Sequence, residues 1–177
     1  MTVSDPATTQ LLSGWGRTAP TLATVHRPDD LEHIVSRVTS PGARGVIARG
    51  LGRSYGDAAQ NAGGDVVSLR HLDAVLDIDV DKGTVTVESG VSLDRLLRTL
   101  LPLGWFPMVI PGTSHVTVGG AISSDIHGKF RHGPFADYLQ SIRIGRPAGR
   151  PPPSDPPDRA TPPEAPTRRA GPPWRPP

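Results

Sequence analysis

The sequence contains no cysteine, few aromatic residues and no long apolar run. Without cysteine it has no disulfide, no thiolate metal ligand and no cysteine nucleophile. No apolar stretch approaches the roughly 20 residues needed to span a bilayer. Residues 1–10 also lack the basic and apolar regions of a secretory signal peptide. These absences favour a cytoplasmic location by default.

Proline and glycine are abundant but unevenly spread. Residues 145–177 hold 13 prolines and no Leu, Ile, Val, Phe, Met or Tyr, so this segment cannot build a hydrophobic core. It holds six arginines against three acids, and therefore contributes +3 to the overall charge of +2 and leaves −1 on residues 1–144. The folded part is not expected to present a basic face to nucleic acid.

These patterns divide the chain into a flexible N-terminus (1–11), one folded domain (12–144) and a disordered Pro/Arg-rich tail (145–177). The composition of the tail is that of a GC-rich gene read out of frame, so a frameshift or a truncated gene is one hypothesis for it. A polyproline II ligand for a partner domain is another, because its Pro-Pro pairs favour that extended helix. An inert disordered terminus is the third.

Hydrophobic periodicity in the folded part predicts an α+β protein. Helices are predicted between Asp30 and Ser40 and between Ser92 and Leu101, each with an apolar stripe and a capping side chain at its start. The predicted strands are 21–26, 45–48, 65–69, 74–79, 84–89, 105–110 and 138–144. Asp81-Lys82-Gly83 joins two of them as a hairpin. The acids around that hairpin suggest a solvated face, and we expect no metal site.

Two glycine-rich loops are the main candidates for function. The first glycine loop, Arg49–Asp57, and the second, residues 111–122, are each predicted to leave a strand. Glycine permits positive φ and a close approach of backbone N–H groups to phosphate oxygens. Ordinary turns between strands would explain either loop alone. Neither matches the dinucleotide fingerprint G-x-G-x-x-G in register, and no P-loop motif is present.

Taken together, the loops resemble the FAD-binding domain of the vanillyl-alcohol-oxidase-type flavoproteins, the PCMH-type fold. Within that superfamily they are most similar to the decaprenylphosphoryl-β-D-ribose 2'-oxidases. The matching segments are Gly14–Pro20, Arg49–Asp57 with Gln60-Asn61, Pro111–Thr113, Val116–Ile122 and Asp125–Lys129. The resemblance implies two small α/β lobes that hold an extended FAD between them, with the C-terminal side of the domain incomplete.

The resemblance also implies which residues contact the cofactor. On one side these are Arg49, Gly50, Gly52, Arg53, Ser54, Tyr55, Ala58 and Asn61. On the other side they are Pro111, Gly112, Thr113, Val116, Gly119, Gly120, Ala121, Ser124, Ile126, His127 and Gly128. His127 and Lys129 are the candidate catalytic residues, on the substrate side of the flavin. Covalent relatives attach the flavin through a histidine in the first loop; here that position is Arg53, so we expect non-covalent FAD.

In that family the flavin oxidises the ribose C2' hydroxyl of a polyprenyl-phosphoryl ribose to a ketone, a step in the synthesis of cell-wall arabinan precursors. The resemblance implies the same substrate for the complete enzyme, a partner reductase of the same pathway, and the alternative of a periplasmic or membrane-associated location. Because the family's substrate domain does not follow residue 144, we expect this chain to be a catalytically incomplete FAD-binding portion. The alternatives are a non-catalytic flavin- or nucleotide-binding module and an unstable gene-fragment product.

Overall fold

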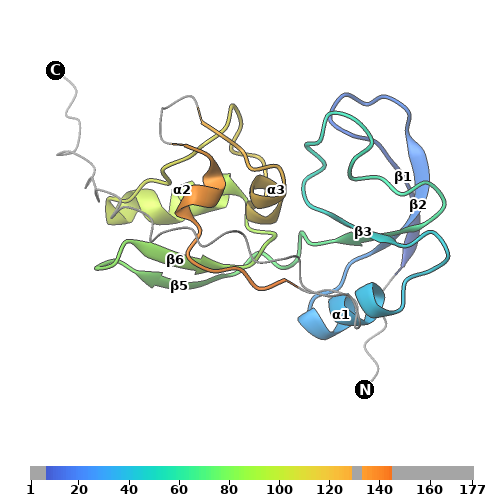
Figure 1. Ribbon diagram of the computed structural model, residues 1–177, viewed down its shortest axis with the longest axis horizontal. Helices are drawn as coiled ribbons and strands as arrows, with labels where there is room; N and C mark the ends of the chain where they lie inside the picture. The colour runs from blue at the N-terminus through green and yellow to red at the C-terminus, as the bar shows by residue number, and fades with distance from the viewer. Residues whose placement is uncertain (1–6, 129–132, 145–177) are drawn as a thin grey trace.

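A computed structural model describes residues 7–128 and 133–144, and Thr8 begins the first strand. The chain forms two lobes, each with a hydrophobic core of its own (Figure 1). The first lobe is a four-stranded sheet in the order β1-β2-β4-β3. Its strands are β1 (Thr8–Leu12), β2 (Thr21–His26), β3 (Val46–Arg49) and β4 (Asp65–Ser68). β1 is antiparallel to β2, whereas β2 and β3 are both parallel to β4, which is therefore the central strand of the three.

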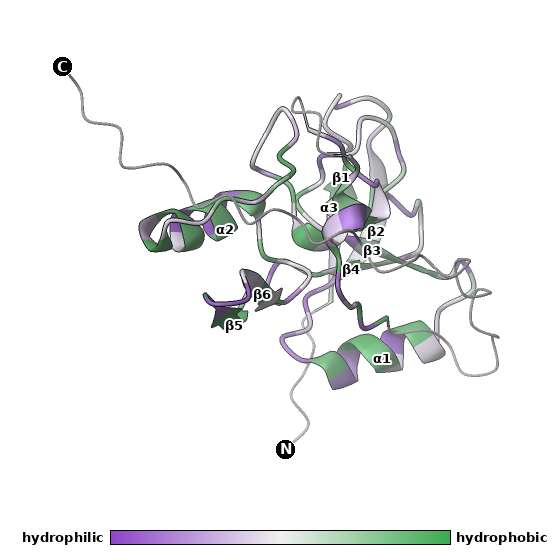
Figure 2. Cartoon of the chain, turned by 60° about the vertical axis from the view of Figure 1, so that its left-hand side comes forward, coloured by the Kyte–Doolittle hydropathy of each residue, from purple (hydrophilic) through white to green (hydrophobic). Residues whose placement is uncertain are grey.

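Helix α1 (Leu31–Thr39) lies below the sheet in Figure 1. Asp30 caps it by accepting the backbone N–H of His33 at 2.8 Å. Figure 2 shows the alternating apolar and polar faces that the sequence predicts. The apolar side faces the sheet across a gap of about 510 Å³, lined by Ile34 and Val38 of the helix and Val67 of β4. No residue of α1 is fully buried, so the helix only partly covers this face of the sheet.

The second lobe packs helices on a hairpin. The hairpin is β5 (Val75–Asp79) and β6 (Thr84–Val87), and the helices are α2 (Leu93–Leu100), η1 (Leu101–Leu103), α3 (Val118–Ser123) and η2 (Phe135–Tyr138). Gly83 takes φ +65° in the hairpin turn and Gly104 takes φ +80° after η1, conformations that favour glycine. Ser92 caps α2, as predicted, by accepting the N–H of Arg95 at 3.1 Å. The core gathers around Val91, Leu93 and Val118.

Three predictions of secondary structure were wrong, and one helix was missed. Residues 105–110 form no strand, because Pro107 has no N–H for a ladder and no neighbouring strand pairs with this segment in the described part of the chain. Residues 139–144 are also irregular, with Ile144 64% exposed. Conversely, residues 8–11, predicted as flexible chain, belong to β1, and α3 was not predicted as a helix. The predicted mixed fold of two small lobes is confirmed.

None of the helices in the described residues combines the length and the apolar character that crossing a membrane requires.

Candidate functional site

The first glycine loop leaves the carboxyl end of β3 and crosses toward the second lobe. Within the described chain, no backbone or side-chain acceptor takes a hydrogen bond from the backbone N–H groups of residues 50–59. Gly52 takes φ +66°, and a Cβ there would lie 3.0 Å from Cζ of Arg49. A run of unpaired N–H donors on a tightly folded glycine loop is suited to an anionic ligand.

The side chain of Arg49 holds the first glycine loop in place through hydrogen bonds to backbone oxygens. Its guanidinium donates to the backbone oxygens of Ala59 and Ser13, both at 2.7 Å. Partial burial lowers the pKa of Arg49, although the group stays charged. The side chain of Arg49, which was predicted to contact the cofactor, thus donates to two backbone carbonyl groups. These hydrogen bonds connect the first loop to Ser13, in the segment that follows β1.

The second glycine loop leads into α3 and is fixed by the core of its lobe. Thr117, which is buried, caps α3 by accepting the N–H of Gly120 at 3.1 Å. The backbone N–H of Gly119 donates to the backbone oxygen of Ser89 at 2.8 Å, and a Cβ on Gly119 would lie 3.1 Å from that oxygen. The prediction that this loop leaves a strand was wrong, because the preceding segment is irregular.

The two loops meet between the lobes. A Cβ on Gly50 would lie 3.0 Å from Cγ2 of Thr117 and closer still to its hydroxyl, so only glycine fits there without displacing the other loop. Arg53 reaches across as well, with Nε donating to the backbone oxygen of His115 at 3.1 Å. Its guanidinium carbon lies 4.1 Å from the ring centre of Trp15. The two glycine loops are therefore in direct contact where the lobes meet.

The remaining predicted residues are distributed less uniformly. Tyr55 and Ala58 are exposed at the outer part of the first loop, Ser54 is half-buried, and Gly112 and Thr113 are exposed on the second. Pro111, Val116 and Ile126 are half-buried, Ala121 is buried, and Ser124 is exposed. Both loops therefore keep some exposed residues that a ligand can reach.

The side chain of Asn61 lies away from the contact between the two glycine loops. Its amide nitrogen donates to the backbone oxygens of Gly45 and Asp65, both at 3.1 Å. These residues stand at the amino ends of β3 and β4, whereas Arg49 stands at the carboxyl end of β3. Asn61 therefore supports the sheet, and its predicted contact with a ligand has no support from this geometry.

The predicted catalytic region begins beside the second loop. A Cβ on Gly128 would lie 3.0 Å from the backbone oxygen of Ile110, so this segment runs against the start of that loop. His127 is exposed and forms an isolated bridge with Pro134. Lys129 lies outside the described residues, as does the predicted disordered tail. The catalytic roles of His127 and Lys129 stay predictions.

The residues that the site predictions missed are Trp15, His115 and Thr117. The backbone N–H of Trp15 donates to the backbone oxygen of Ser54 at 2.7 Å, and a Cβ on the neighbouring Gly14 would lie 2.7 Å from the same oxygen. The signal in the sequence was the glycine-flanked Trp15, but its contact with the first loop depends on the tertiary fold.

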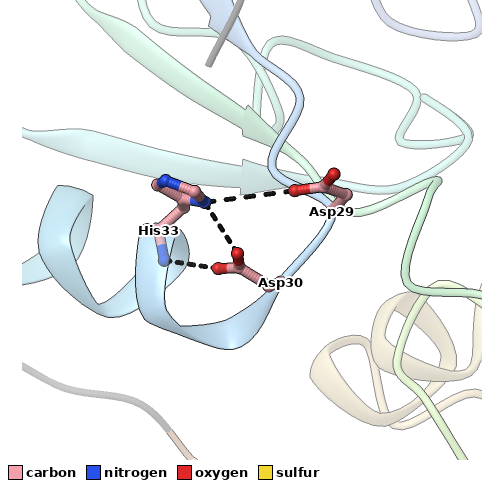
Figure 3. Close-up of side chains that lie close together, drawn as sticks. All are labelled: Asp29, Asp30 and His33. Atoms are coloured by element: carbon pink, nitrogen blue, oxygen red, sulfur yellow. Dashed lines mark hydrogen bonds and ion pairs between the residues drawn. The ribbon is translucent and has the colours of Figure 1, made fainter. Parts of the chain in front are cut away.

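One cluster elsewhere has the residue types of a metal site. Asp29, Asp30 and His33 lie close together at the start of α1 (Figure 3). His33 Nδ1 is 2.9 Å from Asp30 and 4.0 Å from Asp29. The helix cap explains this arrangement, and both carboxylates are exposed, so it gives no support for a metal.

A family model described as an FAD binding domain matches residues 20–151. The chain belongs to this FAD-binding family. Decaprenylphosphoryl-beta-D-ribose oxidase of Mycolicibacterium smegmatis is 51% identical over 148 residues, which are 81% of this chain and 32% of that protein. D-2-hydroxyglutarate dehydrogenase of Escherichia coli is 34% identical over 98 residues, which are 54% of this chain and 10% of that protein. This FAD-binding chain thus spans about a third of the first relative and less of the second.

Solved structures agree on the fold of the FAD-binding domain. A solvent-stable cholesterol oxidase superposes with a TM-score of 0.59 at 22% identity, covering 70% of this chain and 25% of that one. Cholesterol oxidase from B. sterolicum gives a TM-score of 0.60 at 16% identity, again covering 70% and 25%. The predicted cofactor, FAD, is confirmed by the family. The unpaired N–H groups of residues 50–59 fit its diphosphate.

Proposed function

We propose that this chain is the FAD-binding portion of an oxidoreductase that acts on the CH–OH group of a polyprenyl-phosphoryl ribose. The observation that carries the proposal is the meeting of the two glycine loops, Gly50 against Thr117 and Arg53 on His115, between two lobes of an FAD-binding fold. The 51% identity with decaprenylphosphoryl-beta-D-ribose oxidase supports the substrate class. Both loops fall inside the FAD-binding family match, which supports the cofactor.

The chain's own residues supply binding and orientation. The N–H groups of residues 50–59 hold the diphosphate, with Arg53 adding positive charge beside them. Thr117 and Gly119 fix the facing wall. When bound, FAD supplies an acceptor for the hydride of the ribose C2' carbon. His127, exposed next to the second loop, orients the sugar hydroxyl or accepts its proton.

The cofactor is held without a covalent bond. Arg53 occupies the position of the first loop at which covalent relatives carry a histidine, and its guanidinium is engaged with His115 and Trp15. A guanidinium stays protonated in proteins and is not a nucleophile toward the flavin ring. Denaturation of the protein therefore releases all of its flavin into solution.

A second candidate is an FAD-binding module that performs no turnover on its own. The coverage of 32% of decaprenylphosphoryl-beta-D-ribose oxidase favours it, because two thirds of that relative have no counterpart in the match. A partner reductase and a cytoplasmic rather than periplasmic site of action belong to the proposal as well. Co-purification from the native cell and cell fractionation test these two parts.

Reconstitution with FAD separates these possibilities. The full chain is incubated with FAD, desalted, and examined for flavin absorbance, with riboflavin as a ligand that lacks the diphosphate. Retention of FAD but not riboflavin supports the proposed binding mode. Anaerobic addition of farnesylphosphoryl ribose then tests chemistry, since bleaching of the flavin shows oxidation of the sugar. Retained FAD without bleaching selects the non-catalytic module, and loss of all FAD refutes both candidates.

A further inference from the structure

The first lobe contains a second feature suited to anions, a cavity of about 360 Å³. Arg49, Ser68 and Arg70 line it, whereas Ala48, Val67 and Leu69 line the gap beneath α1. Because successive side chains of a strand point to opposite faces, the cavity lies on the face of the sheet away from α1. It opens where the parallel strands β2, β3 and β4 end, the edge at which α/β sheets most often bind ligands.

The charge of this cavity is of one sign. Four arginines line it, Arg27, Arg49, Arg53 and Arg70, and no carboxylate appears among its described lining residues. Gln10 and Ser68 add neutral polar groups. Guanidinium groups that converge in one concave space repel each other, and an anion removes that repulsion.

Two of the arginines, Arg49 and Arg53, are oriented by backbone carbonyl groups. Arg49 donates to two carbonyl oxygens and Arg53 to one, so neither loses its charge to an acid in these contacts. Arg27 donates to the hydroxyl of Thr8 at 2.9 Å and takes part in a further interaction. Arg70 is exposed at the rim, and within the described chain it has no hydrogen-bond or ion-pair partner. The wall is thus positioned in advance, and Arg70 can close over a ligand.

We propose that this cavity is a phosphate-binding site in which Arg27 and Arg70 are ligand-binding residues. Guanidinium forks match the oxygens of a phosphate in pairs. The cavity volume of about 360 Å³ fits a phosphate ester, because small-molecule sites in proteins begin at roughly 300 Å³. The site shares Gly50, Leu51 and Arg53 with the first glycine loop, so it is continuous with the FAD-binding surface.

Two ligands of the proposed function carry a phosphate group that could occupy the cavity. One is FAD, through its diphosphate, and the other is the polyprenyl-phosphoryl sugar, through its phosphodiester. The assignment of the cavity to one of these two ligands rests on the proposed function. The binding of phosphate in the cavity does not. Inorganic pyrophosphate is therefore the probe that tests the cavity independently of flavin binding.

The test compares the double variant R27Q/R70Q with R98Q by isothermal titration of the full chain. Arg98 lies on α2 with its partner Asp94, outside the cavity, and its loss removes a charge of the same sign. We expect the double variant to weaken pyrophosphate binding by roughly tenfold to 100-fold, because hydrogen bonds to charged groups are lost, and R98Q to change it by less than about threefold.

Further ligands identify the source of the phosphate. If the double variant weakens FAD but not riboflavin, the site holds the cofactor's diphosphate. If FAD is unaffected and farnesyl phosphate binding is weakened, the site holds the substrate's phosphate. Equal effects of R27Q/R70Q and R98Q on pyrophosphate, or no binding of pyrophosphate to the unaltered chain, overturn the proposal. If the unaltered chain binds pyrophosphate but does not bind FAD, the proposed function is refuted and the phosphate site is not.

Folding of each variant is checked by circular dichroism. Should R27Q/R70Q unfold, the single variant R70Q decides the matter, because Arg70 is exposed and forms no hydrogen bond or ion pair within the described chain. A roughly fivefold or greater loss of pyrophosphate affinity in R70Q supports the site, and an affinity equal to that of R98Q overturns it.

Discussion

Replacing Gly50 with alanine tests the contact between the two loops directly. The added Cβ would lie 3.0 Å from Cγ2 of Thr117 and closer to its hydroxyl. Thr117 cannot rotate away without losing its cap on α3, the hydrogen bond from Gly120 at 3.1 Å. Overpacking of this kind costs about 1–3 kcal/mol. We expect G50A to unfold at lower urea concentration by that amount and, because the loops are pushed apart, to bind FAD roughly tenfold more weakly.

Gly56→Ala is the matched control, because its Cβ would meet nothing within 4 Å and the residue lies in the same loop. We expect it to change stability by less than about 0.5 kcal/mol. In a double-mutant cycle, T117A removes the clash along with the cap, so G50A/T117A should be more stable than the sum of the single effects predicts. Additivity within about 0.5 kcal/mol, measured by urea denaturation, would falsify the steric contact.

Three further predictions concern single residues. R49K keeps the charge but not the fork that reaches two backbone carbonyls, so it should lower the free energy of unfolding by roughly 1–3 kcal/mol in thermal or urea denaturation. The N–H of His33 and the charge of its ring lower the pKa of Asp30 from 3.8, so the stability from this carboxylate is present above that pH and lost as the pH falls through the lowered value. D30N should therefore lose less stability than the unaltered chain between about pH 5 and about pH 3, and equal losses would contradict this account. FAD should quench the fluorescence of Trp15, which is 54% exposed and stacked on Arg53, so W15F should remove more of the quenching than W105F does.

Local patterns predicted the elements that carry their own signals. The hairpin of β5 and β6 has alternating strands and Gly83 at the turn, and α1 and α2 have a cap and an apolar stripe. By contrast, β1 is a largely exposed edge strand that depends on pairing with β2. The segment 105–110 looks apolar enough for a strand, but Pro107 and the lack of a neighbouring ladder keep it irregular.

In the candidate site, too, local signals predicted some features, and others depend on the tertiary fold. Glycine density located both loops, and the resemblance named most of their residues. It did not show that Arg49 and Asn61 point toward backbone carbonyls, since motif membership says nothing about where a side chain is directed. The contact of Gly50 with Thr117 joins residues far apart in sequence, so only the assembled lobes reveal it.

The position of β4 at the centre of the parallel strands has a consequence for folding kinetics. β3 emerges during synthesis before β4, yet β4 is the strand with which it pairs, so the sheet cannot close until residues 50–64 have folded back. Closing a connection of that length carries an entropic cost that delays the pairing. That connection contains the first glycine loop. Substitutions that loosen the loop are therefore expected to lengthen the time during which nascent β3 stands unpaired and exposed to aggregation.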